Sequence, residues 1–333
     1  MYRFFSSVAR RAAFLVAAPL FLFAASAPAL KQVAVLDLPG RPGFDEIALV
    51  HGMILISHPG AGAVDLFDPQ KRRIVGHIRN MWSPRGFAVD EGAHRVYIAN
   101  AGARNIVVVS TIDWQVKRTI AVDSAPDALF VLPASHTLYV TFPESESIAA
   151  IDLAGDADPN DAASGQNITR LTLEGRPYAF AYDPSRQRLF LTLQDRRSVL
   201  VLSPELKILA SFSLNASEPA GIAFSPRFDR LYVAVRYAVV ALDPGSGAEL
   251  SRTAVAGGID QLSLDDGSSS LLGVSQGSVF LVPASGSLGP ASELAVEVKG
   301  HSLAYDSSTG YLYLPGGREG RSKLLILKRV GTQ

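Results

Sequence analysis

Short apolar segments separated by polar turns recur along this chain at a nearly constant spacing. Each segment begins with an aliphatic residue followed by an aromatic or a second aliphatic one, as in residues 96–99 and 138–141. Counted at Leu55, Tyr97, Tyr139, Phe190, Tyr232, Leu272 and Tyr313, successive copies lie 42, 42, 51, 42, 40 and 41 residues apart. Seven copies with one long step indicate an internal repeat.

Every copy has the same internal order, which predicts a four-stranded sheet. A loop that often ends in proline leads into an apolar strand such as residues 86–89. A polar turn, the recurring segment, a Val-rich strand such as residues 106–109 and a fourth strand such as residues 115–122 follow. Short strands joined by turns form an antiparallel meander, and a period of about 40–45 residues is typical of propeller blades. The predicted fold is therefore all-β, a seven-bladed β-propeller of four-stranded antiparallel blades.

The two ends of the repeat predict how the ring closes. The seventh copy supplies three strands, the last at residues 323–327, and residues 32–38 carry a strand pattern before the first copy. We expect this N-terminal strand to complete the last blade, since that leaves no open sheet edge in the ring. An insertion at residues 155–166 explains the long step, and residues 30–333 form a single domain.

Residues 1–29 have the layout of a secretory signal peptide. Arg3, Arg10 and Arg11 precede an apolar run at residues 12–25, and small residues follow up to Ala29. The alternative is an uncleaved membrane anchor, but this run contains Pro19 and is shorter than the roughly 20 residues needed to span a bilayer. We expect an exported protein, periplasmic or secreted, with no stable membrane anchor after cleavage.

Composition narrows the classes of function. Without the three arginines of residues 1–29, the chain has 28 basic and 31 acidic residues. This slightly negative net charge does not indicate a nucleic-acid partner. The chain has no cysteine, which excludes disulfides, a thiol nucleophile and thiolate metal ligands.

Units such as Val96-Tyr97-Ile98-Ala99-Asn100 and Leu138-Tyr139-Val140-Thr141 resemble the YVTN repeats of exported bacterial propellers, the YncE-like proteins of the WD40/YVTN repeat-like superfamily. The resemblance covers roughly residues 31–329. It implies an extracytoplasmic seven-bladed propeller, and it carries over no catalytic residue because that family is functionally mixed.

The repeat also predicts a ring of residues around the central channel. In a propeller, the loop that enters each first strand opens on the channel mouth, where ligands usually bind. The residues that open the seven first strands are Asp45, Arg85, Asp127, Tyr178, Ala220, Asp260 and His301, with Glu46 as an alternative to Asp45.

Two interpretations of this ring remain open. Asp127, Asp260 and His301 could hold a divalent cation such as Ca²⁺ or Mg²⁺, which would polarise a lactone or ester carbonyl. Their position is similar to that of the metal ligands in gluconolactonase-like and streptogramin-lyase-like propellers, although the Asn-Gly and His–Glu ligands of those families are absent. Alternatively, the polar groups line a water-filled channel in which Arg85 pairs one or two acids.

Arginines are frequent in the loops of the same face. The candidates for binding an anionic ligand or acidic partner are Arg104, Arg176, Arg196, Arg236 and Arg318. Acidic residues such as Glu144 and Glu218 are interspersed, and the chain uses 24 Arg against seven Lys throughout, so a solvated rim of mixed charge is the alternative.

The sequence thus favours a binding module, a monomer that presents its channel-mouth face to a small ligand or a protein partner. It assigns no catalytic residue and no confident cofactor. The alternative function is a metal-dependent lactonase, hydrolase or lyase that uses the acidic ring.

Overall fold

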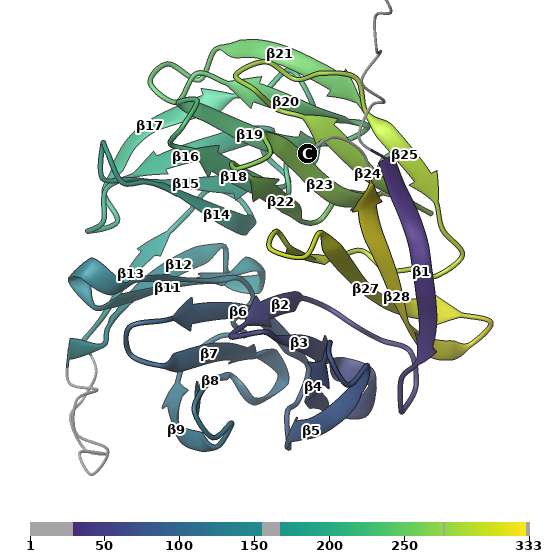
Figure 1. Cartoon of the computed structure of the whole chain (residues 1–333). Helices are drawn as coiled ribbons and strands as arrows, with labels where there is room; N and C mark the ends of the chain where they lie inside the picture. Colours follow the sequence, from purple (N-terminus) through teal and green to yellow (C-terminus); the bar gives the residue numbers. More distant parts are fainter. Residues whose placement is uncertain (1–28, 155–166, 276, 331–333) are drawn as a thin grey trace, which may run out of the picture.

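Seven four-stranded antiparallel sheets surround a central axis in the computed structural model, which describes residues 29–154, 167–275 and 277–330 (Figure 1). The predicted seven-bladed propeller is confirmed. Residues 1–28, which belong to the predicted signal peptide at residues 1–29, and the predicted insertion at residues 155–166 lie outside the described residues. Within those ranges, no helix is long and apolar enough to cross a membrane.

Blades 1 to 6 each use four strands that are consecutive in the chain and hydrogen-bonded in that order. Blade 1 comprises β2 (Ile47–Val50), β3 (Met53–His58), β4 (Ala63–Asp68) and β5 (Arg73–Arg79). Blade 2 comprises β6 (Pro84–Asp90), β7 (Arg95–Asn100), β8 (Asn105–Ser110) and β9 (Val116–Ala121). Blade 3 comprises β10 (Leu129–Leu132), β11 (Thr137–Phe142), β12 (Ser147–Asp152) and β13 (Ile168–Thr172).

The second half of the ring repeats this order. Blade 4 comprises β14 (Pro177–Asp183), β15 (Arg188–Leu193), β16 (Ser198–Leu202) and β17 (Ile208–Ser213). Blade 5 comprises β18 (Ile222–Ser225), β19 (Arg230–Val235), β20 (Ala238–Leu242) and β21 (Glu249–Ala254). Blade 6 comprises β22 (Leu262–Asp265), β23 (Ser270–Ser275), β24 (Ser278–Pro283) and β25 (Ser292–Ala295).

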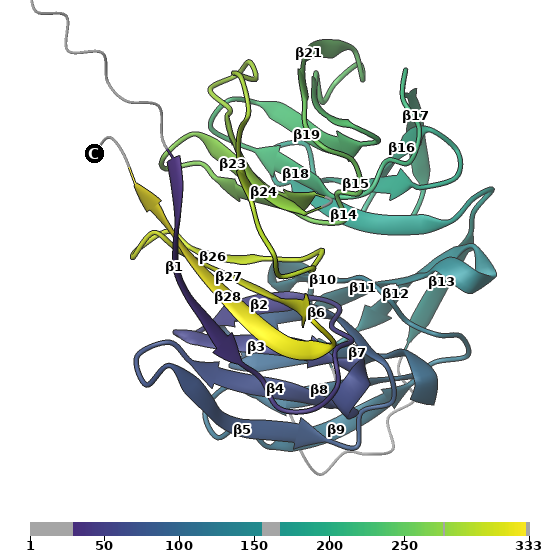
Figure 2. The ribbon, with the colours of Figure 1, turned by 90° about the vertical axis from the view of Figure 1, so that its right-hand side faces the viewer.

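Blade 7 combines the two ends of the described chain, as predicted. It comprises β26 (Ala304–Asp306), β27 (Tyr311–Arg318), β28 (Arg321–Val330) and β1 (Ala29–Asp37). β1 pairs antiparallel with β28 from Ala29 opposite Val330 to Asp37 opposite Lys323, and the two strands lie side by side in Figure 2. The ring is therefore closed by hydrogen bonds between segments that are far apart in the sequence, which leaves no gap between first and last blade.

The recurring aromatic residue of the repeat packs each blade against the next. Tyr97 of blade 2 lies in one buried cluster with Leu138 and Val140 of blade 3, and Phe190 of blade 4 packs with Leu231 of blade 5. Full burial of such side chains contributes roughly 1.5–3 kcal/mol each. The seven-fold recurrence in the sequence thus reflects seven equivalent contacts between blades.

Tyrosine at this position also supplies a hydrogen bond. The hydroxyl of Tyr139 donates to the carbonyl of Pro204 in the next blade at 2.8 Å, and that of Tyr232 donates to the carbonyl of Ala284 at 3.1 Å. A buried hydroxyl needs such a partner. Burial, which removes the hydroxyl from water, raises the pKa of Tyr139 to about 12. The hydroxyl therefore keeps its proton and remains a donor.

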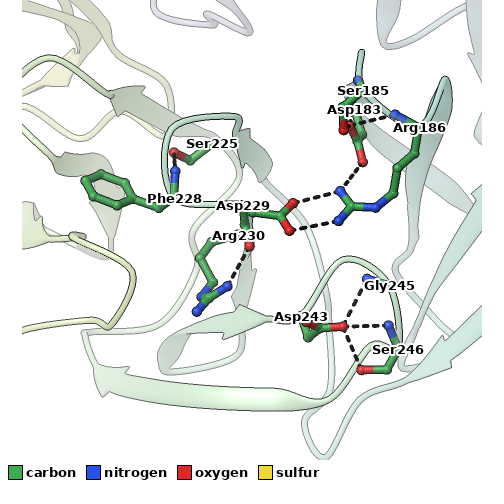
Figure 3. Close-up of polar contacts among 10 residues, drawn as sticks. All are labelled: Asp183, Ser185, Arg186, Ser225, Phe228, Asp229, Arg230, Asp243, Gly245 and Ser246. Atoms are coloured by element: carbon green, nitrogen blue, oxygen red, sulfur yellow. Dashed lines mark hydrogen bonds and ion pairs between the residues drawn. The ribbon is translucent and has the colours of Figure 1, made fainter.

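Aspartates fix the turns on the face opposite the channel mouth (Figure 3). The buried carboxylate of Asp183 accepts from the backbone N–H of Ser185 at 2.9 Å and from the guanidinium of Arg186 at 2.8 Å. Arg186 also donates through both terminal nitrogens to Asp229 of blade 5, at 2.7 and 2.8 Å. Asp243 accepts from the backbone N–H of Ser246 at 2.8 Å. Asp183 and Asp243 thus fix the turns that follow their strands, and the pair Arg186–Asp229 joins blades 4 and 5.

Candidate functional site

The first strands of the seven blades enclose a cavity of about 220 Å³ at the channel mouth. Polar side chains at or beside the starts of these strands line it, and apolar side chains further along the strands form its deeper wall. The polar lining consists of Asp45, Glu46, Asp127, Tyr178, Asp260, Gln261, His301 and Ser302. The apolar lining includes Leu129, Phe130, Phe180, Ile222 and Leu262.

Most of the predicted ring residues therefore converge on one cavity. Equivalent backbone bonds place them, because the N–H groups of Asp45 and Asp127 donate at 3.0 Å to the carbonyls of Ser57 and Thr141, which end the recurring segment of their blades. Ala220 makes the same bond to Ala234 at 2.9 Å, but neither Ala220 nor Arg85 lines the cavity. Glu46, which the sequence left as an alternative to Asp45, lines the cavity beside it.

Two of the ring carboxylates are paired with cations. Arg85 Nη1 lies 2.5 Å from Asp45 Oδ2, as expected if Arg85 neutralises an acid of the ring. His301 Nδ1 lies 3.1 Å from Asp260 Oδ2, and its Nε2 lies 3.0 Å from the carbonyl oxygen of Phe44. The hydrogen bond to Asp260 raises the pKa of His301 to about 9 against the opposing effect of burial. His301 is therefore an imidazolium at neutral pH, and both ring nitrogens donate.

The other two carboxylates of the cavity have perturbed pKa values. Burial, together with the charges of Asp45 and Asp127, raises the pKa of Glu46 to about 8. Burial and Asp45 raise the pKa of Asp127 to about 6, although Arg85 and Arg176 act in the opposite direction. The charged forms of both groups are thus disfavoured, and around neutral pH the pair shares about one proton.

Tyr178 contacts the same group of acids. Burial, followed by the nearby negative charges of Asp260 and Asp127, raises the pKa of Tyr178 far above its ordinary value. The tyrosine is a neutral donor at every physiological pH, the opposite of an activated nucleophile.

A glycine lets the acids of blades 1 and 3 approach each other. A Cβ atom on Gly86 would lie 2.8 Å from Glu46 Oε2 and 2.7 Å from the backbone oxygen of Asp127. Both distances are too short for a carbon atom, and the Asp127 oxygen belongs to the backbone and also accepts from the N–H of Gly86 at 3.2 Å. Only glycine at this position is compatible with the observed arrangement.

Hydroxyl groups at the end of the recurring segment brace the strands around the cavity. Thr192 of blade 4 donates at 2.9 Å to the carbonyl of Ala220 in blade 5, and Ser57 of blade 1 donates to that of Arg85 in blade 2. Thr141 accepts from the N–H of Ala128 at 2.8 Å. Sequence reasoning missed this role, although Ser or Thr at the fourth position of the segment was a visible signal.

The five rim arginines differ in their partners. Arg236 pairs with Glu218 at 2.8 Å and Arg318 with Glu297 at 2.7 Å, while Arg196 donates to the carbonyl of Glu174. Arg104 and Arg176 are exposed, and neither makes an ion pair with another described residue. The rim is thus of mixed charge, and its arginines do not form one anion-binding cluster.

Blade 1 contains a network of polar side chains that the sequence did not predict. Asp65 is buried and lies 2.8 Å from Nδ1 of His58 and 2.7 Å from Nδ1 of His77. Nε2 of His58 bonds the carbonyl of Arg41 at 2.8 Å, and its ring stacks on Phe44 with 4.2 Å between ring centroids. This network fixes the loop that places Asp45 and Glu46 at the cavity.

Metal ligation at the predicted ligands has no geometric support. Among the residues that the structure describes, no group of three or more His, Asp or Glu side chains is arranged to hold an ion. Both nitrogens of His301 are in hydrogen bonds, so a metal there would have to displace Asp260 or Phe44. Metal binding by Asp127, Asp260 and His301 therefore stays a prediction.

Comparison with known proteins supports the fold. No family model and no curated protein matches the chain. A chain of hydrazine synthase from Kuenenia stuttgartiensis is similar in structure, with a TM-score of 0.72 and 14% sequence identity over 89% of this chain and 97% of that one. At this identity the likeness shows the propeller fold alone, and membership of the YVTN-repeat family stays a prediction.

Proposed function

We propose that this chain is an extracytoplasmic binding protein that holds a small ligand in the cavity at its channel mouth. The observation that carries the proposal is the convergence of polar side chains from blades 1, 3, 4, 6 and 7 above an apolar wall. Ligand sites are typically concave and largely apolar, with a few converging polar groups. A cavity of about 220 Å³ is below the roughly 300–1,000 Å³ usual for drug-sized ligands, which favours a smaller molecule.

The polar groups of the cavity suit recognition better than nucleophilic catalysis. Ser302 donates its hydroxyl to the backbone carbonyl of Asp45, and the hydroxyl of Tyr178 is held as a neutral donor. Neither is paired with a base that would activate it. The rival function, a metal-dependent hydrolase or lyase, needs a ligand set that the hydrogen bonds of His301 oppose.

The proposed extracytoplasmic location rests on the resemblance of residues 1–29 to a signal peptide and on the resemblance of the repeats to exported YVTN-repeat propellers. Fractionation of cells that express the full chain tests it. We expect the protein in the periplasm or the medium, without the leader, and recovery of the full-length chain from the cytoplasm contradicts the proposal.

Filling the cavity tests the binding function. Ala179 lines the cavity, whereas Ala248 is exposed in a turn of the opposite face, so Ala179→Leu and Ala248→Leu are matched substitutions. Ligand-detected NMR would screen cationic, neutral and anionic fragments of a few carbons or one aromatic ring. We expect binding by the wild type and by Ala248→Leu, and its loss in Ala179→Leu.

The melting temperature of each variant shows whether it is folded, and Ala128→Leu provides a second cavity-filling variant if Ala179→Leu unfolds. The proposal is wrong if no fragment binds the wild type. It is also wrong if cavity filling leaves binding unchanged, because the ligand then sits elsewhere.

A further inference from the structure

Two carboxylates of the cavity lack a cationic partner. Asp45 is neutralised by Arg85 and Asp260 by His301. Glu46 and Asp127, by contrast, make no ion pair with any residue that the structure describes, and both face the cavity. With Asp45 and Asp260 neutralised in pairs, Glu46 and Asp127, which share about one proton around neutral pH, leave this part of the cavity with a net negative charge.

An apolar wall lies directly beyond these carboxylates. Asp127 opens the strand that continues to Leu129 and Phe130, and all three residues line the cavity. Phe130 and Phe180, from neighbouring blades, have ring centroids 6.4 Å apart and line it together. Aromatic faces attract organic cations, and they also provide contact area for hydrocarbon.

We propose that the ligand is a small primary ammonium compound, with its charged nitrogen between Glu46 and Asp127 and its hydrocarbon part against Phe130 and Phe180. The inference rests on the proposed function, since it names the class of ligand for the same cavity. An ammonium group brings three hydrogen-bond donors to these two carboxyl groups and stabilises their ionised forms.

An anionic ligand fits this cavity less well. The two cations of the ring, Arg85 and His301, already donate to Asp45 and Asp260. An anion would have to break these pairs and would also face the two unpaired carboxylates.

A bare metal ion fits less well for a different reason. Calcium takes about 6–8 oxygen ligands in a compact shell, whereas the cavity presents an aromatic and aliphatic wall on one side of its carboxylates. Such a wall contributes nothing to metal coordination, but it would bind the carbon atoms of an amine.

A charge series of one shape tests the inference. Benzylammonium, benzyl alcohol and benzoate share the ring and differ in the charge of the polar group. Calorimetric titration at pH 8.5, where Glu46 is largely ionised, isolates the effect of that charge. We expect benzylammonium to bind at least about 10-fold more tightly than the alcohol, the value of about one charge-assisted hydrogen bond, and benzoate to bind most weakly.

Isosteric variants locate the charge. Asp127→Asn and Glu46→Gln keep the shape of the side chains, and we expect each to weaken benzylammonium binding about 10-fold while the affinity for benzyl alcohol changes little. Arg252→Ala, on the outer strand β21 where Arg252 pairs with Glu249 at 2.7 Å, is the control and keeps wild-type affinity. Titration with Ca²⁺ and Mg²⁺ completes the series.

The outcomes separate the two proposals. Equal or tighter binding of benzyl alcohol or benzoate, or binding of Ca²⁺ or Mg²⁺ but not of the amine, overturns the ammonium inference and leaves a small-ligand cavity intact. Amine binding that survives both Asp127→Asn and Glu46→Gln also overturns it. Failure of the whole fragment screen in the wild type overturns the proposed function as well.

Discussion

Carboxylates on the two faces of the propeller are in opposite electrostatic states. On the face opposite the channel, burial acts to raise the pKa of Asp183, but hydrogen bonds from Ser185 and Arg186 outweigh it and lower the pKa. The hydrogen bond from Arg186 likewise lowers the pKa of Asp229. At the channel mouth, burial and neighbouring acids raise the pKa of Glu46 to about 8 and that of Asp127 to about 6.

The difference shows which carboxylates the fold itself uses. A carboxylate that caps its turn and binds an arginine is satisfied by the protein, and its ionised form stabilises the folded state. A carboxylate that faces a cavity among like charges destabilises the folded state when it ionises, and a bound cation would relieve this. Strongly perturbed groups in a concave site are candidates for function on this physical ground.

The largest effect in this comparison is expected at Asp183. Its side chain is fully buried and accepts hydrogen bonds from Ser185 and Arg186, so Asp183→Ala leaves buried donors without an acceptor. We expect the free energy of unfolding to fall by about 3 kcal/mol, measured by urea denaturation at pH 7. Asp229→Ala, at a half-exposed partner of Arg186, should cost less than about 1 kcal/mol. Equal losses would show that burial is not what distinguishes the two sites.

The fold was predictable from the sequence because every blade contains a copy of the same apolar segment. The position of Leu55, Tyr97 and their equivalents placed the strands, and the unpaired strand pattern at residues 32–38 predicted the closure of blade 7. The most divergent copy, at residues 271–274, still forms the second strand of its blade.

The candidate site was predictable only as a ring of positions. Equivalence between copies identifies residues at the channel mouth, but it does not say which side chains touch across blades. That Arg85 pairs with Asp45, or that Glu46 lies beside Gly86, depends on the stagger between neighbouring first strands. Asp65 and His77 are opposite each other in the register of β4 and β5, but the contact of Asp65 with His58 depends on side-chain geometry that the repeat does not specify.

The second largest effect concerns Glu46. Its pKa is raised in the folded protein, so the folded state keeps a proton that the unfolded state releases. The stabilisation is complete below the ordinary value of 4.5 and is lost as the pH rises towards about 8. Glu46→Gln imitates the protonated form, so we expect it to be more stable than the wild type by at least about 2 kcal/mol at pH 8.5 and to gain nothing at pH 4.

Urea denaturation of the wild type and Glu46→Gln across this pH range measures the difference. A gain that is the same at pH 4 and pH 8.5 would mean that the substitution acts through packing and not through the charge of Glu46.

A smaller effect is expected at His301, with the same dependence on pH. Its pKa is raised to about 9, so the imidazolium pair with Asp260 stabilises the protein below the ordinary value of 6.5 and is lost as the pH rises through about 9. Because His301 and Asp260 are 44% and 38% exposed, water screens the pair, and we expect no more than about 1 kcal/mol. Comparison of wild type and His301→Gln at pH 6 and pH 10 measures it. Nitrogen NMR of the imidazole should show titration near pH 9, and titration near 6.5 would contradict the pairing.

The smallest effect distinguishes two arginines of the rim. Arg176 lowers the pKa of Asp127, whereas the exposed Arg236 is occupied by Glu218. Arg176→Ala should therefore raise the pKa of Asp127 slightly above about 6, and Arg236→Ala should leave it unchanged. Carbon NMR of the Asp127 carboxyl group measures both, and neither variant should change the free energy of unfolding by more than about 0.5 kcal/mol. If Arg236→Ala shifts Asp127 as much as Arg176→Ala does, the whole rim acts on the cavity as one diffuse field. The contrast between paired and unpaired charges would then not extend to the arginines.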